Sequence, residues 1–311
     1  MAFPHTRRAP ATLRGRRARV GYAFLAPAAA VVASVTLGPI LYAVFLSLSQ
    51  VRLTGEGFAT TWAGLANYAI LYRAPEFWQA LAFTAGYTGA TVLVEVALGL
   101  VVALVLNGLV RGRGLAMAVL LLPWSLITVV SAEVWSYLDN GAYGLIDYVL
   151  VVLHVTSQPV NWLGEPTLAL VAVGLADVWK TTPFVALILL AGLQMIRRDL
   201  YEAATLDGAG PWKSFWRVTF PLLRPSLLVA VLFRVLQSFG LFDLPFVLTS
   251  GGPGTTTQSL ALLAYRAMFN DLEFGPGTAV SVVTVAAVVL VAVLFIRGLG
   301  VRLGEAGDGA A

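Results

Sequence analysis

Six stretches of this chain are so long and apolar that they determine what it can fold into. They cover residues 20–51, 77–110, 115–138, 167–196, 226–250 and 275–296. A helix needs about 20 apolar residues to cross roughly 30 Å of hydrocarbon, whereas strands of a lipid-facing barrel alternate over about 10 residues. Because a helix satisfies its own backbone in lipid, the sequence predicts an all-α integral membrane protein with six transmembrane helices.

Composition agrees with a membrane protein and excludes several other classes. Hydrophobic residues make up 59% of the chain and charged residues 12%, about half the charged share of soluble domains. The absence of cysteine excludes disulfides, thiolate metal sites and a cysteine nucleophile. Two histidines argue against a multi-histidine metal centre. We therefore predict no metal site and no catalytic site.

The basic residues predict the orientation of the helices. Fifteen of the 20 Lys and Arg residues fall in segments that lie on one side of the predicted membrane, namely 1–19, 111–114, 197–225 and 297–311. Because basic residues accumulate in cytoplasmic segments, both termini are predicted to be cytoplasmic, with tails at 1–19 and 301–311 around a transmembrane domain at 20–300. The net charge of +4 then reflects topology in a prokaryotic inner or plasma membrane, and no nucleic-acid partner is expected.

The first apolar stretch has a second interpretation. Its arginine-rich start and the small residues Ala28–Ala30 also resemble a signal peptide with a cleavage site. The 32 uncharged residues exceed the usual apolar segment of a signal peptide, which favours an uncleaved anchor. Pro27 and Pro39 are expected to bend or delimit this helix.

The cytoplasmic loop 197–225 predicts two short helices joined by a glycine turn. Asp199 and Glu202 have the spacing of a capping box at the start of the first helix. Gly208 suits the left-handed position that ends it. Pro211 fits the first turn of the second helix, and Pro221 is expected to end that helix.

The second helix of this loop has an apolar stripe, which is formed by Trp212, Phe215, Trp216 and Thr219. Such a helix can lie on the inner leaflet with its basic residues on lipid headgroups. It can also dock in a groove of a partner protein, where each large aromatic side chain would contribute about 2 kcal/mol by burial. We favour docking.

Several motifs resemble a known family. Glu202-Ala203-Ala204, Asp207-Gly208-Ala209, Phe215 and the segment 220–225 resemble the EAA loop of permeases from binding-protein-dependent ABC importers. Segments 179–184, 248–253 and 274–275 resemble the sugar-importer branch of that family.

The resemblance covers about residues 20–300 and is strongest to the first permease subunit of maltose-, glycerol-phosphate- and trehalose-type systems. Residues 177–193 and 232–252 favour the trehalose type. The chain differs from the maltose protein in lacking a large outer domain and extra amino-terminal spans.

The resemblance implies a type I ABC importer permease fold with a cytoplasmic EAA-type coupling helix that sits in a cleft of an ATPase subunit. It implies coupling roles for Glu202, Ala203, Ala204, Asp207, Gly208, Phe215 and Pro221. It also implies a second homologous permease subunit, a dimer of ABC ATPase subunits and an extracytoplasmic sugar-binding protein. The expected function is ATP-driven import of a sugar, with a disaccharide such as trehalose or maltose favoured.

ATP itself is not expected to bind this chain. The segment 174–181 has the first glycine and the Lys-Thr of a phosphate-binding loop, but Trp179 replaces the glycine that lets backbone approach phosphate. We therefore expect no enzyme activity and no cofactor here. ATP and Mg would bind the partner ATPase.

Charged residues inside the spans leave several interpretations open. Asp177 and Lys180 are neighbours on one helix face and can neutralise each other. Arg234 and Asp243 are too far apart along one helix to pair directly, so each can pair across helices or line the solute path. Glu95 and Glu133 are assigned mostly to packing and hydrogen bonding.

A sugar needs hydrogen-bonding groups and an aromatic surface in the middle of its pathway. The spans at 167–196 and 226–250 offer both, so the predicted substrate-pathway residues are Trp179, Lys180, Gln237, Phe239, Phe242 and Asp243.

Two other functions fit the sequence less well. In an ion-gradient-driven secondary transporter, Asp177, Asp243 and Glu95 would couple ion movement to transport, but six spans without a detectable inverted repeat argue against it. An intramembrane enzyme would need a catalytic motif that the sequence lacks.

Overall fold

The computed structural model describes residues 11–55 and 57–298, and the predicted tail at 301–311 and the first ten residues of the tail at 1–19 lie outside them. Its elements are the helices α1 (Ala11–Ser47), α2 (Ala66–Arg73), α3 (Pro75–Gly108), α4 (Arg113–Ser125), α5 (Thr128–Leu138), α6 (Leu145–Val152), α7 (Pro166–Gln194), α8 (Arg198–Leu206), α9 (Pro211–Ser214), the π-helix η1 (Phe215–Thr219), α10 (Phe220–Phe239), α11 (Asp243–Leu248), α12 (Leu260–Phe269) and α13 (Phe274–Gly298), and the strands β1 (Ser49–Thr54) and β2 (Gly57–Trp62).

The prediction of a mostly helical membrane protein is confirmed. Among the described residues, five helical segments are long and apolar enough to cross a membrane, namely Val20–Ser47, Pro75–Gly108, Pro166–Gln194, Pro211–Phe239 and Phe274–Arg297. Helices α4 and α5 pass the same test as a pair and give a sixth span when they are counted as one broken span. The sequence did not predict the short antiparallel hairpin of β1 and β2, in which Ser49 pairs with Trp62.

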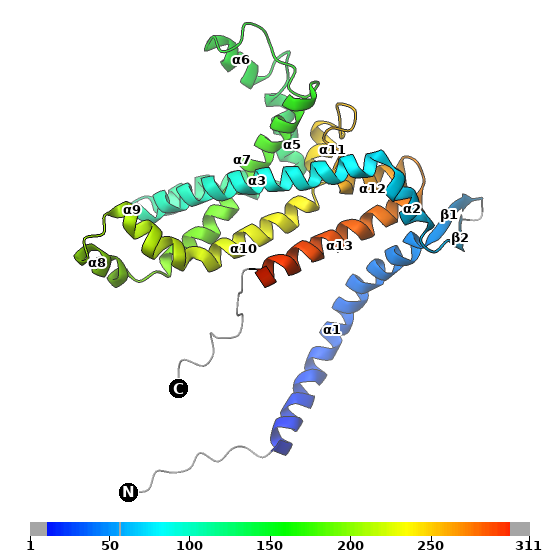
Figure 1. Cartoon of the computed structure of the whole chain (residues 1–311), viewed down its shortest axis with the longest axis horizontal. Coiled ribbons are helices and arrows are strands. Elements are labelled where there is room, and N and C mark those ends of the chain that lie inside the picture. The colour runs from blue at the N-terminus through cyan, green and yellow to red at the C-terminus, as the bar shows by residue number, and fades with distance from the viewer. Residues whose placement is uncertain (1–10, 56, 299–311) are drawn as a thin grey trace.

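The sequence predicted a single transmembrane helix for the third apolar stretch, but the structure shows two helices there. Helices α4 and α5 meet at an angle of 91°, and α5 turns away from the bundle toward α6 (Figure 1). Pro123 lies in the last turn of α4, where it donates no backbone hydrogen bond. Leu126 and Ile127 then adopt extended backbone angles, so the chain changes direction within the span.

The fifth stretch is also interrupted. Helix α10 ends at Phe239, and α11 starts as a separate short helix at Asp243. Gly240, which costs more to order in a helix than other residues do, caps α10. Phe242 and Asp243 are therefore not on the same helix as Gln237, which corrects the prediction.

The core of the bundle lies where α3, α7 and α10 meet. Fully buried side chains such as Leu189 and Leu223 form its centre. Gly99 lets α3 approach α7 closely, because a Cβ built there would lie 2.7 Å from Cγ1 of Val185. These three helices run side by side along the bundle (Figure 1). Their core side chains therefore meet in the middle of the bundle, away from its two ends.

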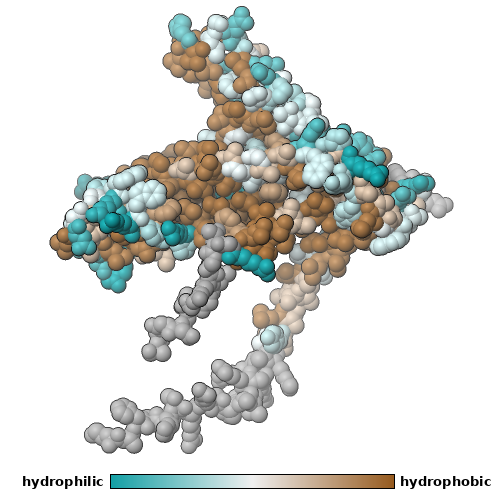
Figure 2. Space-filling view, viewed as in Figure 1, coloured by the Kyte–Doolittle hydropathy of each residue, from teal (hydrophilic) through white to brown (hydrophobic). Residues whose placement is uncertain are grey.

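Helix α1 diverges from the rest of the molecule (Figure 1). It continues through Pro27 and Pro39, so neither proline delimits the helix. Figure 2 shows hydrophobic residues over much of the bundle and hydrophilic residues gathered at the end that carries α8 and α9. This pattern agrees with a bundle surrounded by lipid.

A short helix, α6, lies in the connection between α5 and α7. Asp147 on α6 accepts hydrogen bonds from the backbone N–H of Val160 at 3.2 Å and from Nε1 of Trp162 at 2.9 Å. This carboxylate therefore holds the segment that returns to α7.

Candidate functional site

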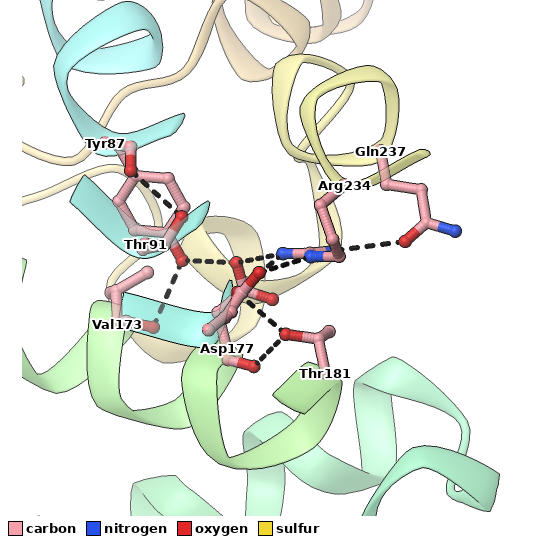
Figure 3. Close-up of polar contacts among 8 residues, drawn as sticks. Tyr87, Thr91, Val173, Asp177, Thr181, Arg234 and Gln237 are labelled. Carbon is pink, nitrogen blue, oxygen red and sulfur yellow. Dashed lines mark hydrogen bonds and ion pairs between the residues drawn. The ribbon is translucent and has the colours of Figure 1, made fainter. Parts of the chain in front are cut away.

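A buried network of charged and polar side chains joins the three central helices. Figure 3 shows the guanidinium of Arg234 reaching from α10 toward Asp177 on α7. Nε of Arg234 donates to Oε2 of Glu95 at 2.5 Å, and Nη2 donates to Oε1 of Glu95 at 2.8 Å and to Oδ2 of Asp177 at 3.2 Å. One cation thus bridges carboxylates on two other helices.

Neutral groups complete this network. Tyr87 on α3 donates its hydroxyl to Oδ2 of Asp177 at 3.1 Å. The hydroxyl of Thr181 donates to Oε1 of Glu95 at 2.8 Å, and Nη1 of Arg234 donates to Oε1 of Gln237 at 3.0 Å. Because ions removed from water need several partners, this arrangement explains how the bundle holds charges at its centre.

The network decides between the interpretations of the charged residues. Arg234 pairs across helices with Glu95 and Asp177, so Glu95 is an ion-pair partner and does not serve packing and hydrogen bonding alone. Asp177 pairs with Arg234, whereas Lys180 donates to the backbone oxygen of Leu126 at 2.7 Å. The pairing of Asp177 with Lys180 is therefore not the one formed. Glu133 is exposed.

A polar cavity of about 290 Å³ lies beside the network. Four of the six predicted substrate-pathway residues line it, namely Lys180, Gln237, Phe242 and Asp243. Asp177, Thr181 and Arg234 line it too, as do Trp124 and Thr128 beside the break between α4 and α5. The cavity thus combines charged groups, an amide, hydroxyls and two aromatic rings.

Two of the six predicted residues lie elsewhere. The ring of Trp179 packs edge-on against Trp135 on α5, with centroids 6.0 Å apart. Phe239 is buried and does not line this cavity. Sequence reasoning missed Trp124 and Thr128, although Pro123 marks where the third span could bend. The bend is what brings both side chains to the cavity.

The predicted coupling residues gather at the α8 and α9 end of the bundle (Figure 1). Glu202, Ala203, Asp207 and Gly208 are exposed, whereas Ala204 is half-buried. Gly208 has a φ of +73°, and the backbone N–H of Ala209 donates to the carbonyl of Ala204 at 2.9 Å. The left-handed glycine turn is confirmed.

Two other details of this loop were predicted wrongly. No side chain caps α8 at its N-cap Arg197, and the carboxylate of Asp199 instead accepts from the guanidinium of Arg197, so the capping box is absent. Pro221 does not end the second helix, because a proline in the first turn of a helix loses no internal hydrogen bond. Here α9, η1 and α10 run on as one helical segment to Phe239.

The aromatic side chains of this end are partly exposed. Trp212 is 74% and Trp216 48% exposed, with their ring centroids 5.8 Å apart. Phe215 is half-buried against Trp216 at 5.1 Å. The hydroxyl of Tyr201 on α8 forms a hydrogen bond of 3.0 Å with the hydroxyl of Thr219. This bond connects α8 to the helical segment Pro211–Phe239. The exposed aromatic face of Trp212 and Trp216 is therefore part of a continuous helix that runs into the bundle.

Curated proteins similar to this chain are transport permeases. The chain is 40% identical over 286 residues to the trehalose/maltose transport system permease protein MalF of Thermococcus litoralis, covering 92% of this chain and 95% of that protein. It is 37% identical over 282 residues to the trehalose transport system permease protein SugA of Mycobacterium tuberculosis, covering 91% and 89%.

A solved bacterial ABC transporter involved in the import of the acidic polysaccharide alginate has a similar fold. One of its chains matches with a TM-score of 0.78 and 22% identity, covering 93% of this chain and 98% of that one. Residues 11–303 match the family described as binding-protein-dependent transport system inner membrane component. The chain belongs to this family and is a multi-pass permease subunit of an ABC importer.

Proposed function

We propose that this permease carries a sugar into the cytoplasm, with a disaccharide such as trehalose or maltose as its cargo. The observation that carries the proposal is the chemistry of the 290 Å³ cavity, where Gln237, Lys180 and Asp243 lie beside the ring of Phe242. Polar groups of this kind bind hydroxyls, while an aromatic ring covers the apolar face of a sugar. The relatives named for trehalose and maltose transport support the same cargo.

The proposed assembly contains three further protein components. A second homologous permease subunit pairs with this chain within the lipid, and an extracytoplasmic sugar-binding protein docks on the outer face. A dimer of ABC ATPase subunits binds ATP and Mg and contacts the end of the bundle that carries α8. With that end inside, both termini are cytoplasmic, in agreement with the positions of the basic residues.

The coupling helix 202–208 transmits the state of the ATPases to the bundle. Glu202 faces a basic residue of the ATPase, and Gly208 allows the turn into α9. ATP-driven closure of the ATPases pushes the two coupling helices together, and the bundle opens outward to accept sugar. Hydrolysis resets it inward. The free energy comes from nucleotide, and this chain supplies a gate whose two states the nucleotide biases.

The test is uptake by the complete transporter in proteoliposomes. We expect uptake of radiolabelled trehalose or maltose that requires ATP and the binding protein and that persists when ion gradients are collapsed. Gln237→Leu should raise the KM for the sugar about fivefold, because one lost hydrogen bond is worth roughly 1 kcal/mol. Gln194→Leu, at the exposed end of α7, is the matched control.

Retention of a non-sugar solute by the cognate binding protein would contradict the proposed cargo. Uptake that continues without the ATPase subunits would contradict the mechanism.

A further inference from the structure

Lys180 makes an unusual contact with the broken third span. Its Nζ donates to the backbone oxygen of Leu126 at 2.7 Å. Leu126 is the C-cap of α4 and directly precedes Ile127, the N-cap of α5. Within residues 11–55 and 57–298, no backbone N–H donates to this oxygen. Because unpaired backbone groups are costly inside a membrane, Lys180 satisfies a carbonyl that the break exposes.

Two aromatic contacts flank this hydrogen bond. Trp124, at the end of α4, stacks on Phe184 with ring centroids 5.6 Å apart and planes at 17°. Trp135 on α5 packs against Trp179. Helix α7 therefore holds both arms of the bend, and Lys180 lies between the two aromatic contacts along α7. The hydrogen bond from Lys180 to Leu126 is polar, whereas the other two contacts are between aromatic rings.

Lys180 also lines the polar cavity. Its ammonium has three protons, and Leu126 is its one hydrogen-bond acceptor in the described part of the chain. Thr128, the first residue of α5, lines the same cavity. An acceptor that enters the cavity therefore meets both the free protons of Lys180 and the start of the second arm.

The carboxylates nearest in the cavity do not occupy this ammonium. Asp177 is engaged by Arg234 and Tyr87. Asp243, at the start of α11, lines the cavity without a hydrogen bond to Lys180 among the described residues. The ammonium can thus leave the backbone oxygen of Leu126 and donate instead to an oxygen of a solute in the cavity.

We propose that Lys180 is a positioning residue that couples occupancy of the cavity to the angle between α4 and α5. With the cavity empty, Lys180 holds the oxygen of Leu126 and fixes the bend. A polyhydroxylated solute draws the ammonium into the cavity, which releases that oxygen and loosens the bend. This inference rests on the proposed function in one respect, which is that the solute is a sugar.

The test measures the bend directly in the complete transporter. The chain contains no cysteine, so Leu122→Cys and Tyr137→Cys, at residues 61% and 65% exposed, place one spin label on each arm. Pulsed EPR then gives the distance distribution without solute and with trehalose. We expect trehalose to shift or broaden the wild-type distribution.

Lys180→Met should show the loosened distribution before any sugar is added and should not respond to trehalose. Lys180→Arg keeps a cationic donor and should retain the response. Lys213→Met, at an exposed lysine of α9, is the control and should match the wild type. A merely structural role for Lys180 would leave the response to trehalose intact.

Three outcomes would overturn the inference. They are a wild-type bend indifferent to trehalose while trehalose uptake proceeds, a Lys180→Met distribution equal to the wild type, or a full trehalose response in Lys180→Met. The wild-type measurement needs no variant and holds even if Lys180→Met fails to assemble. Absence of sugar uptake by the wild type would instead contradict the proposed function.

Discussion

Arg234 on α10 and Glu95 on α3 form a two-point ion pair at the centre of the bundle. Nε lies 2.5 Å from Oε2, and Nη2 lies 2.8 Å from Oε1. The side chains are 3% and 0% exposed, so water contributes little to their solvation. The residues are 139 positions apart in the sequence, and their pairing fixes how α3 and α10 face each other.

Removing the cation of this pair should destabilise the bundle. Arg234→Met leaves two buried carboxylates without their partner, which costs about 3–5 kcal/mol for a buried pair. A lower melting temperature of the purified complex would show it. Arg217→Met, at an exposed arginine, should melt like the wild type, and adding Glu95→Gln to Arg234→Met should recover part of the loss. Equal melting of the two arginine variants would contradict the prediction.

Gly99 should be intolerant of a methyl group. A Cβ at this position would lie 2.7 Å from Cγ1 of Val185 and 3.2 Å from the backbone nitrogen of Ala186. Gly99→Ala therefore forces α3 and α7 apart, and overpacking costs about 1–3 kcal/mol. Gly89→Ala is the matched control on the same helix, because its Cβ meets nothing within 4 Å. Thermal unfolding in detergent compares the two, and a Gly99→Ala protein as stable as Gly89→Ala would refute the close packing.

Gly208 should be required for coupling rather than for insertion. Its φ of +73° strains any β-branched residue, by roughly 1–2 kcal/mol for left-handed backbone, so Gly208→Val should tilt α8 away from its docking geometry. We expect normal assembly, with uptake reduced about tenfold relative to ATP hydrolysis. Gly210→Val, where φ is −70°, should transport normally. The ratio of sugar uptake to ATP hydrolysis distinguishes them, and unchanged coupling in Gly208→Val would remove the assigned role.

Asp139 should make the segment around α6 sensitive to pH. Burial, together with the charge of Asp147, raises the pKa of Asp139 from 3.8 to about 6. Between about pH 4 and pH 6 the folded state holds a proton that the unfolded state has lost, so stability is greater at low pH and falls as the pH rises through 6, by up to about 3 kcal/mol.

Hydrogen exchange of residues 139–153, corrected for intrinsic rates, should show stronger protection at pH 5 than at pH 7. Asp139→Asn, which cannot ionise, should abolish that difference. Protection that increases with pH in the wild type would show that the sign is wrong.

Local features of the chain were predictable from the sequence because they depend on neighbouring residues. The six apolar stretches follow from the length of a helix across a bilayer. The turn at Gly208 follows from the backbone freedom of glycine. The EAA-type loop indicated the family before any contact was known. The capping box at Asp199 and Glu202 failed because spacing permits a contact without enforcing it.

Contacts between distant segments were decided only by the tertiary structure. Sequence spacing excluded a pair between Arg234 and Asp243, but it could not identify Glu95 as the partner, because the partner depends on how α3 and α10 pack. The same is true of Lys180, whose acceptor exists only because the third span breaks at Leu126. The sequence thus determined which segments enter the membrane, since hydrophobicity acts on each segment by itself. The fold decided which charges meet, since a buried ion is stable only where the packing of other helices supplies its partner.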